Sequence, residues 1–74
     1  MNKACAALLV GRTVFVAEDV DVFQRTLVAV ACDEHGDYVY LEGPRGAITA
    51  DLEYVYETRE AAERAAALIA LEDD

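Results

Sequence analysis

The sequence predicts a small α+β domain, in which a bent antiparallel sheet or small barrel of four or five strands carries one helix at the C-terminal end. Apolar and β-branched segments recur at intervals of about 10 residues, separated by turns that contain Gly, Pro and Asp, as in small β-rich folds. Only the last part of the chain shows the period of a helix. The 74 residues contain no linker, repeat or low-complexity segment, so we expect one domain over residues 1–74.

The N-terminal part of the chain predicts two strands. Residues 1–10 leave strand, helix and disorder open, because their apolar run is too short for periodicity to decide. Residues 13–17 (TVFVA) alternate as a strand with Val14 and Val16 facing inward. Residues 23–32 (FQRTLVAVAC) predict a second strand, which is long enough that we expect it to bend.

The middle of the chain predicts two hairpins. Residues 33–37 (DEHGD) predict a turn in which Gly36 adopts a positive φ. The returning strand, residues 38–42, alternates between tyrosine and aliphatic side chains. Residues 43–46 (GPRG) then predict a second turn before a short strand at residues 47–50.

The C-terminal part predicts a strand that leads into the only long helix. We expect residues 51–53 to tighten into a 3₁₀ turn and residues 53–57 to form the final strand. Thr58 offers a hydroxyl as the N-cap of a helix over residues 59–71. One face of this helix is mostly alanine and is expected to lie close against the sheet. Its residues are Ala62, Ala65, Ala66 and Ile69.

The charge balance of the chain indicates a basic partner. Fifteen Asp and Glu oppose six Lys and Arg, which gives a formal net charge of −9. Such a surface repels nucleic acid and anionic membranes and accelerates the encounter with basic proteins. We therefore expect no direct binding to nucleic acid or to a membrane.

The two cysteines, Cys5 and Cys32, are too few for the disulfide framework of a small secreted protein. We interpret them as buried thiols in a reducing cytoplasm, with a disulfide between them as the open alternative. The apolar run before Gly11 is at the lower limit of a signal peptide, and no run reaches the roughly 18 residues of a membrane span. A cytoplasmic protein is therefore expected.

Two kinds of side chain are candidates for binding a protein partner. Carboxylates in rows along a strand, about 6.6 Å apart, would imitate a phosphate backbone, whereas solubility is the simpler explanation of their number. Tyrosine pairs on two strands would form an aromatic stripe that grips a partner, whereas half-buried tyrosines are also ordinary in sheets. The candidate residues are Glu18, Asp19, Asp21, Asp33, Glu34, Asp37, Tyr38, Tyr40, Asp51, Glu53, Tyr54 and Tyr56.

Patterns that would support catalysis or metal binding are weak. Cys32 and His35 have a Cys-x-x-His spacing, but a structural zinc site needs four ligands and the chain has no second such pair. Calcium-binding, phosphate-binding and nucleophile–base patterns are also missing from the sequence. We therefore expect no enzyme activity, no metal and no cofactor.

Three segments carry a resemblance to a group of known proteins. They are a Gly-x-Thr-Val-aromatic strand at residues 11–15, a Gly-Asp-aromatic-Val hairpin at residues 36–39, and a strand-Thr-Arg-Glu-Ala helix start at residues 55–61. Together they resemble short phage and mobile-element proteins with an SH3-like barrel and a C-terminal helix. In size and acidity the chain also resembles small anti-CRISPR proteins. The resemblance implies an SH3-like barrel and a function inside a bacterial host.

These observations lead to three functional hypotheses. The first is a non-enzymatic, DNA-mimicking inhibitor that covers a basic nucleic-acid-binding surface of a host protein, for example an anti-CRISPR that blocks DNA access to a CRISPR effector subunit. The second is a phage accessory or adaptor module that binds a peptide or protein through its tyrosines. The third is a structural homodimer that pairs exposed strand edges, so both a monomer and a weak homodimer stay open.

Overall fold

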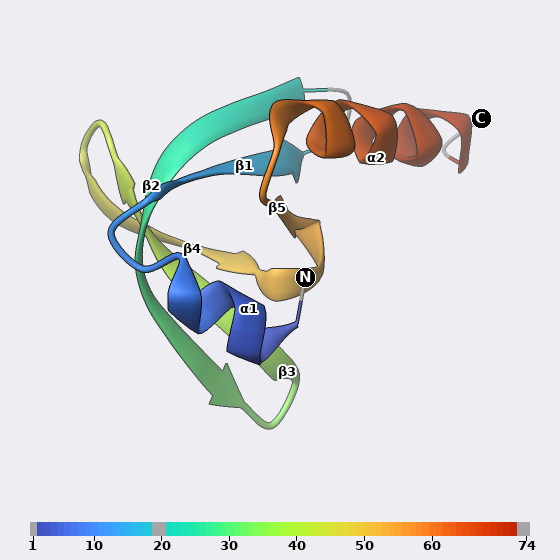
Figure 1. Cartoon of the computed structure of the whole chain (residues 1–74). Coiled ribbons are helices and arrows are strands. Elements are labelled where there is room, and N and C mark those ends of the chain that lie inside the picture. The colour runs from blue at the N-terminus through green and yellow to red at the C-terminus, as the bar shows by residue number, and fades with distance from the viewer. Residues whose placement is uncertain (1, 19–20, 73–74) are drawn as a thin grey trace.

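The computed structural model describes residues 2–18 and 21–72 and shows a five-stranded antiparallel sheet with two helices (Figure 1). The fold is therefore α+β and rich in strand, as predicted. The elements in chain order are α1 (Lys3–Leu8), β1 (Thr13–Glu18), β2 (Asp21–Asp33), β3 (Gly36–Gly43), β4 (Gly46–Asp51), the 3₁₀ helix η1 (Leu52–Tyr54), β5 (Val55–Tyr56) and α2 (Arg59–Glu72).

The sheet is strongly bent but not closed. Its strand order is β4-β3-β2-β1-β5, so β4 and β5 are its two edges. Of the two predicted alternatives, the structure therefore has the bent sheet and not the closed barrel. Figure 1 shows β2 curving around one side of the molecule, so that β1 and β4 lie across the concave face from one another.

A β-bulge allows β2 to bend. The register with β3 shifts between Leu27 and Ala29, which leaves Val28 as an extra residue in β2. Leu27 is fully buried, whereas Val28 is half exposed. The bend that the length of this strand predicts is thus present, within one continuous sheet.

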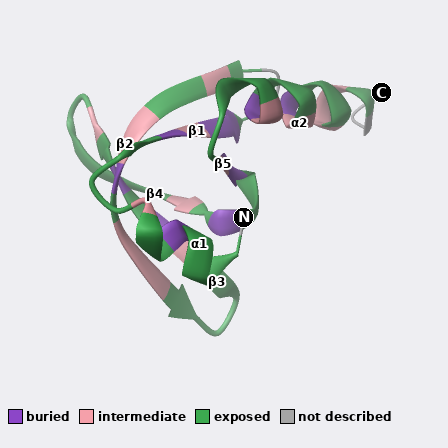
Figure 2. Ribbon diagram, viewed as in Figure 1, coloured by how far each residue is buried: buried purple, intermediate pink, exposed green. Residues whose placement is uncertain are grey.

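The main core lies on the concave face of the sheet (Figure 2). Val14 and Val16 of β1 face this core as predicted, and Phe15 lies on the other face. Aliphatic side chains from β2, β3, η1 and β5 complete it together with one alanine of α1. The buried members of this cluster are Ala6, Val14, Val16, Leu27, Val39, Leu41, Leu52 and Val55.

The two predicted hairpin turns are confirmed. Asp33 pairs with Gly36 across the first turn, and Gly36 has a φ of 128°. Gly43 pairs with Gly46 across the second turn, and Gly46 has a φ of 120°. Residues that have a side chain rarely adopt such φ angles, so these two positions require glycine.

The predicted final strand is largely wrong. We expected a 3₁₀ turn over residues 51–53 and a strand over residues 53–57. The 3₁₀ turn is present one residue later, as η1 (Leu52–Tyr54), and β5 consists of Val55 and Tyr56 alone. Leu52 and Val55 are both buried in the core. A 3₁₀ turn brings side chains three residues apart onto one face, whereas a strand would place these two on opposite faces.

Helix α1 resolves the ambiguity of the first ten residues. The side chain of Asn2 accepts a hydrogen bond of 2.8 Å from the backbone N–H of Cys5, which caps the helix. Ala6 is buried in the core, and the backbone N–H of Gly11 donates to the carbonyl of Leu27 at 2.7 Å. Helix α1 therefore covers one end of the concave face.

Helix α2 packs on the other side of the sheet, next to β1, β2 and β5. The predicted N-cap is present, since the hydroxyl of Thr58 accepts a hydrogen bond of 3.2 Å from the N–H of Ala61. Ala62 and Ala66 are buried, as the predicted small-residue face requires. The guanidinium of Arg59 lies 5.1 Å from the ring centre of Phe15, on the face of β1 opposite to the core.

Candidate functional site

Part of the acidic set and part of the tyrosine set meet at one hollow in the surface. Tyr38 from the start of β3 and Tyr54 from η1 line it together with the carboxylates of Glu18 and Asp51, which end β1 and β4. Val16 and other small residues complete its lining. The hollow therefore combines aromatic, acidic and apolar side chains from four different elements.

A second hollow adjoins the first through Asp51. It is lined by Asp37 and Glu53, with His35 and Gly36 from the β2–β3 turn. We name the residues that these two hollows bring together the acidic–tyrosine surface. Its members are Glu18, Asp37, Tyr38, Asp51, Glu53 and Tyr54.

A third tyrosine borders this surface. The rings of Tyr38 and Tyr40 are 5.5 Å apart between centres and meet edge to face at 66°, and their hydroxyls are 3.4 Å apart. The predicted pairing of these two tyrosines on one face of β3 is therefore confirmed. Tyr40 and Tyr54 are both partly exposed, so both are available to a partner.

The electrostatic field of the carboxylates acts on the tyrosines. The charge of Glu53, followed by burial and by the charge of Asp51, raises the pKa of Tyr54 above its ordinary value. The hydrogen bond and the charge of Tyr40 raise the pKa of Tyr38, with burial and Asp33 contributing. Both phenols therefore stay neutral to a higher pH than an ordinary tyrosine, and the neutral form donates a hydrogen bond.

Among the described residues, no Lys or Arg forms an ion pair with a carboxylate of this surface. Within residues 2–18 and 21–72, the ion pairs are Glu34 with His35 and Glu60 with Arg64, and both are solvent-exposed. Neither pair includes a carboxylate of the acidic–tyrosine surface. A Lys or Arg of a partner could thus pair with these carboxylates without breaking an existing ion pair.

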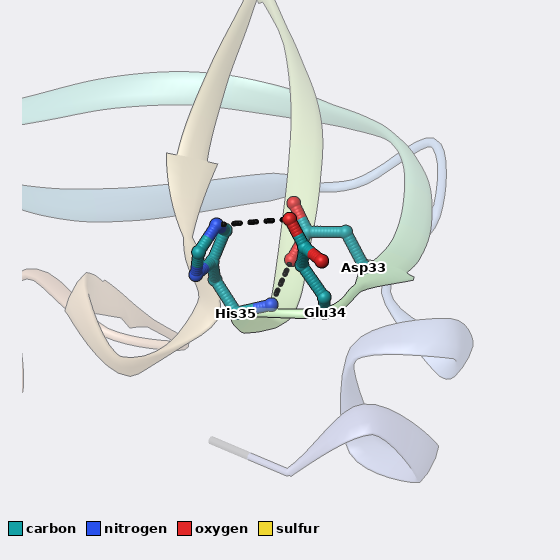
Figure 3. A network of polar contacts seen from close by, with 3 residues as sticks. All are labelled: Asp33, Glu34 and His35. Atoms are coloured by element: carbon teal, nitrogen blue, oxygen red, sulfur yellow. Dashed lines mark hydrogen bonds and ion pairs between the residues drawn. The ribbon is translucent and has the colours of Figure 1, made fainter.

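The tip of the β2–β3 hairpin uses its acidic residues differently (Figure 3). Asp33 Oδ1 accepts a hydrogen bond of 2.8 Å from the backbone N–H of His35, which stabilises the turn. Glu34 Oε1 lies 3.4 Å from His35 Nε2, and both side chains are more than four-fifths exposed. Asp33 and Glu34 are therefore turn residues beside the acidic–tyrosine surface and do not line its hollows.

Two further predicted residues do not line these hollows. Asp21 is absent from both linings, although it is paired with Glu18 across the end of the β1–β2 hairpin. Tyr56 is paired with Phe15 on the edge strand β5, and β2 and β1 separate it from Tyr38 and Tyr40 on β3, so the four tyrosines do not form one stripe. Asp19 lies outside the described residues.

The expectation that carboxylates line up along single strands is also not met. Asp51 ends β4, whereas Glu53 lies in η1, so these two residues do not share a strand. The surface draws its carboxylates from the ends of β1 and β4, the start of β3, and η1. Their grouping depends on how the bent sheet brings strand ends together, which sequence spacing alone does not reveal.

The interpretation of the cysteines as buried is wrong. Cys5 and Cys32 are both exposed free thiols, because Cys5 lies on the outer side of α1 and Cys32 near the exposed end of β2. The Lys3 ammonium lies 3.6 Å from Cys32 Sγ. Among the described residues, no three His, Cys, Asp or Glu side chains are grouped so that they could hold a metal ion.

The apolar lining of the first hollow is what sequence reasoning missed. Val16, Ala17 and Ala50 lie beside the acidic and aromatic groups. The alternation of residues 13–17 marked Val16 as inward-facing, but only the bend of the sheet shows that it borders an opening.

No helix in the described ranges is long and apolar enough to cross a membrane. Comparisons with protein-family models, with curated proteins and with solved structures gave no match to this chain.

Proposed function

We propose that the acidic–tyrosine surface binds a basic, nucleic-acid-binding surface of a host protein and so blocks the access of nucleic acid. In this proposal the protein is a non-enzymatic inhibitor. Its most concrete form is an anti-CRISPR that occludes the DNA channel of a CRISPR effector subunit. The observation that carries the proposal is the meeting of Tyr38 and Tyr54 with the carboxylates of Glu18 and Asp51 in one hollow.

Charge supports this choice of partner. The chain has a net charge of −9, and the surface adds the carboxylates of Asp37 and Glu53 beside those of the first hollow. Such a field attracts basic proteins and repels nucleic acid. A protein surface that binds nucleic acid carries Lys and Arg for the phosphates, and these are the groups that unpaired carboxylates bind.

The tyrosines are expected to supply most of the binding energy, which exposed charges alone do not. Exposed ion pairs contribute little to affinity, about 0.2–1 kcal/mol each. Aromatic side chains near the centre of an interface often dominate its binding energy, and an Arg guanidinium also stacks on their rings. Tyr38 and Tyr54 are therefore the expected anchors, with carboxylates around them that set orientation and the rate of encounter.

The experiment is affinity capture from a nuclease-treated bacterial host lysate, followed by a competition assay with the captured protein. We expect a nucleic-acid-binding protein that is released at moderate salt. Duplex or single-stranded nucleic acid should compete with the chain for it. If none of the nucleic acids that the partner binds competes with the chain, the proposal is contradicted.

A second candidate function rests on the contact between Tyr38 and Tyr40 and on the apolar lining of the first hollow. In an adaptor that binds a peptide or another phage protein, these groups would carry the affinity and the charge would serve solubility. Replacement of both Tyr38 and Tyr54 by Ala should then abolish binding, whereas charge reversals should change it little. Salt-resistant binding would favour this candidate.

A further inference from the structure

The sheet leaves an unpaired strand edge beside the acidic–tyrosine surface. β4 is the terminal strand of the sheet and pairs with β3 alone. On the opposite side of the concave face, β5 pairs only with Phe15 and Val16 of β1, so Ala17 and Glu18 lie beyond its end. The edge of β4 and the end of β1 thus face one another without the strand that would close the sheet.

Two hollows that share four lining residues occupy the space between them. The first hollow of the acidic–tyrosine surface and a neighbouring hollow of about 110 Å³ are both lined by Val16, Glu18, Thr49 and Ala50. The neighbouring hollow adds apolar side chains, among them Phe23 and Ile48, which are 36% and 43% exposed. It also adds Arg25, whose guanidinium lies 5.3 Å from the ring centre of Phe23. We name this space between β4 and β1 the seam.

β4 has few of the features that protect a sheet edge, and Asp51 is its only charged residue. Sheet edges that avoid pairing usually carry Lys or Pro, a bulge or a covering element. β4 has the sequence GAITAD, with neither Lys nor Pro, and its register with β3 is continuous from Tyr38–Asp51 to Gly43–Gly46. Alternate backbone N–H and C=O groups of an edge strand point away from its partner and remain able to pair with another strand.

We infer that the seam accepts an extended basic segment of the partner protein, which adds to β4 as a sixth strand. This inference rests on the proposed function, because it names how a basic partner would engage the acidic–tyrosine surface. The affinity would come from backbone hydrogen bonds to β4, and the selectivity from alternate side chains.

The alternation of side chains along β4 determines which side chains the bound segment should carry. Ile48 and Ala50 face the concave side, since they pair with Leu41 and Val39 of the core, whereas Thr49 and Asp51 face the other side. An added strand would therefore place apolar side chains on the concave face, beside Ile48 and Ala50, and basic side chains on the other face, beside Asp51. A segment of about six residues, about 20 Å long at 3.3 Å per residue, would cover the length of β4.

A second copy of the chain is a poor occupant of the seam. Each copy has a net charge of −9, and β4 carries an Asp and no Lys or Arg. Pairing two β4 edges would also bring the carboxylates that flank the seam, Glu18 and Asp51, toward those of the other copy. A basic strand removes this repulsion and replaces it with attraction.

The test uses the full chain and the peptide acetyl-Lys-Val-Lys-Val-Lys-Val-amide as the probe. Amide hydrogen exchange followed by NMR should show slower exchange within Gly46–Asp51 when the peptide is added. The same peptide with every backbone amide N-methylated keeps its charge but cannot donate to β4, and it should give no such protection. Equal protection by both peptides, or none by either, would overturn the inference.

A pair of seam variants provides a second measurement. Ile48→Lys puts a cation on the edge, so the affinity for the Lys-Val peptide should fall at least tenfold, whereas Ile48→Val should change it less than threefold. Equal affinities of the two variants would count against strand addition. Protection of β4 that appears without peptide and grows with protein concentration would assign the edge to a second copy instead.

These results are separable from a failure of the proposed function. Peptide protection of β4 together with a partner that nucleic acid cannot displace would support strand addition and contradict the inhibitor. A partner displaced by nucleic acid but causing no protection of Gly46–Asp51 would support the inhibitor and overturn strand addition.

Discussion

Reversing two charges on the acidic–tyrosine surface tests whether binding depends on where the charge lies. The double variant Asp51→Lys/Glu53→Lys changes carboxylates that line the two hollows. The matched control is Glu42→Lys/Glu63→Lys, which reverses exposed carboxylates on β3 and α2. Both variants change the net charge from −9 to −5, because each of the two substitutions removes one negative charge and adds one positive charge.

The expected difference follows from the geometry. An exposed ion pair contributes about 0.2–1 kcal/mol, and reversal replaces this attraction by a repulsion of similar size. Two reversals therefore cost about 0.8–4 kcal/mol, which is about a 4-fold to 700-fold loss of affinity. Glu42 is paired with Ala47, which is four residues along β4 from Asp51, about 13 Å. The screening length at physiological salt is about 8 Å, so the control should change affinity less than about twofold.

The assay is titration calorimetry or surface plasmon resonance with the captured partner at several salt concentrations. We expect the surface variant to lose affinity and salt dependence and the control to keep both. Equal losses for the two variants would mean that only net charge matters, which refutes a specific site. No loss for either would refute the electrostatic explanation and favour binding through the tyrosines.

Three further predictions concern the fold and the local field. Leu27→Ala empties a fully buried position and should lower the free energy of unfolding by about 2–5 kcal/mol in chemical denaturation, whereas Leu8→Ala, at a position 80% exposed, should change it by less than about 0.5 kcal/mol. Thr58→Ala should cost about 1 kcal/mol in the same assay and Thr58→Ser much less, because only alanine lacks the N-cap hydroxyl. Glu53→Gln should lower the pKa of Tyr54 in an NMR titration of its ring. Because the pKa of Tyr54 is raised in the folded state, the free energy of unfolding of the wild-type protein should fall as the pH rises through that pKa. Glu53→Gln should make this fall smaller.

The fold was largely predictable because its signals are local. Gly36 and Gly46 hold positive φ angles at the two hairpin turns, and the alternation around Val14 and Val16 sets the core face of β1. The 3₁₀ turn was predicted one residue early, but the short length of the final strand was not, because Leu52 and Val55 both enter the core across that turn. Short segments of this kind follow the demands of packing rather than a strand period.

The site was predictable in its residue types but not in its grouping. Asp51 and Tyr54 belong to two separate predicted sets, and the structure places them in one hollow with Tyr38. Tyr56, only two residues after Tyr54, lies instead beside Phe15. The difference arises because Tyr54 belongs to the 3₁₀ turn η1 and Tyr56 to the strand β5, so the two tyrosines do not share the face that period-two alternation assigns to them.

The open sheet links the fold to the proposed binding. A closed barrel would pair β4 on both sides and leave a partner only side chains to contact. Here β5 ends after two residues, because the chain turns at Glu57 and Thr58 to start α2, and the seam stays open beside Glu18 and Asp51. The feature that departs from the expected barrel is thus the one that exposes backbone donors and acceptors next to unpaired carboxylates. Lengthening β5 so that it closed the seam should then stabilise the fold and weaken the binding of an extended basic strand.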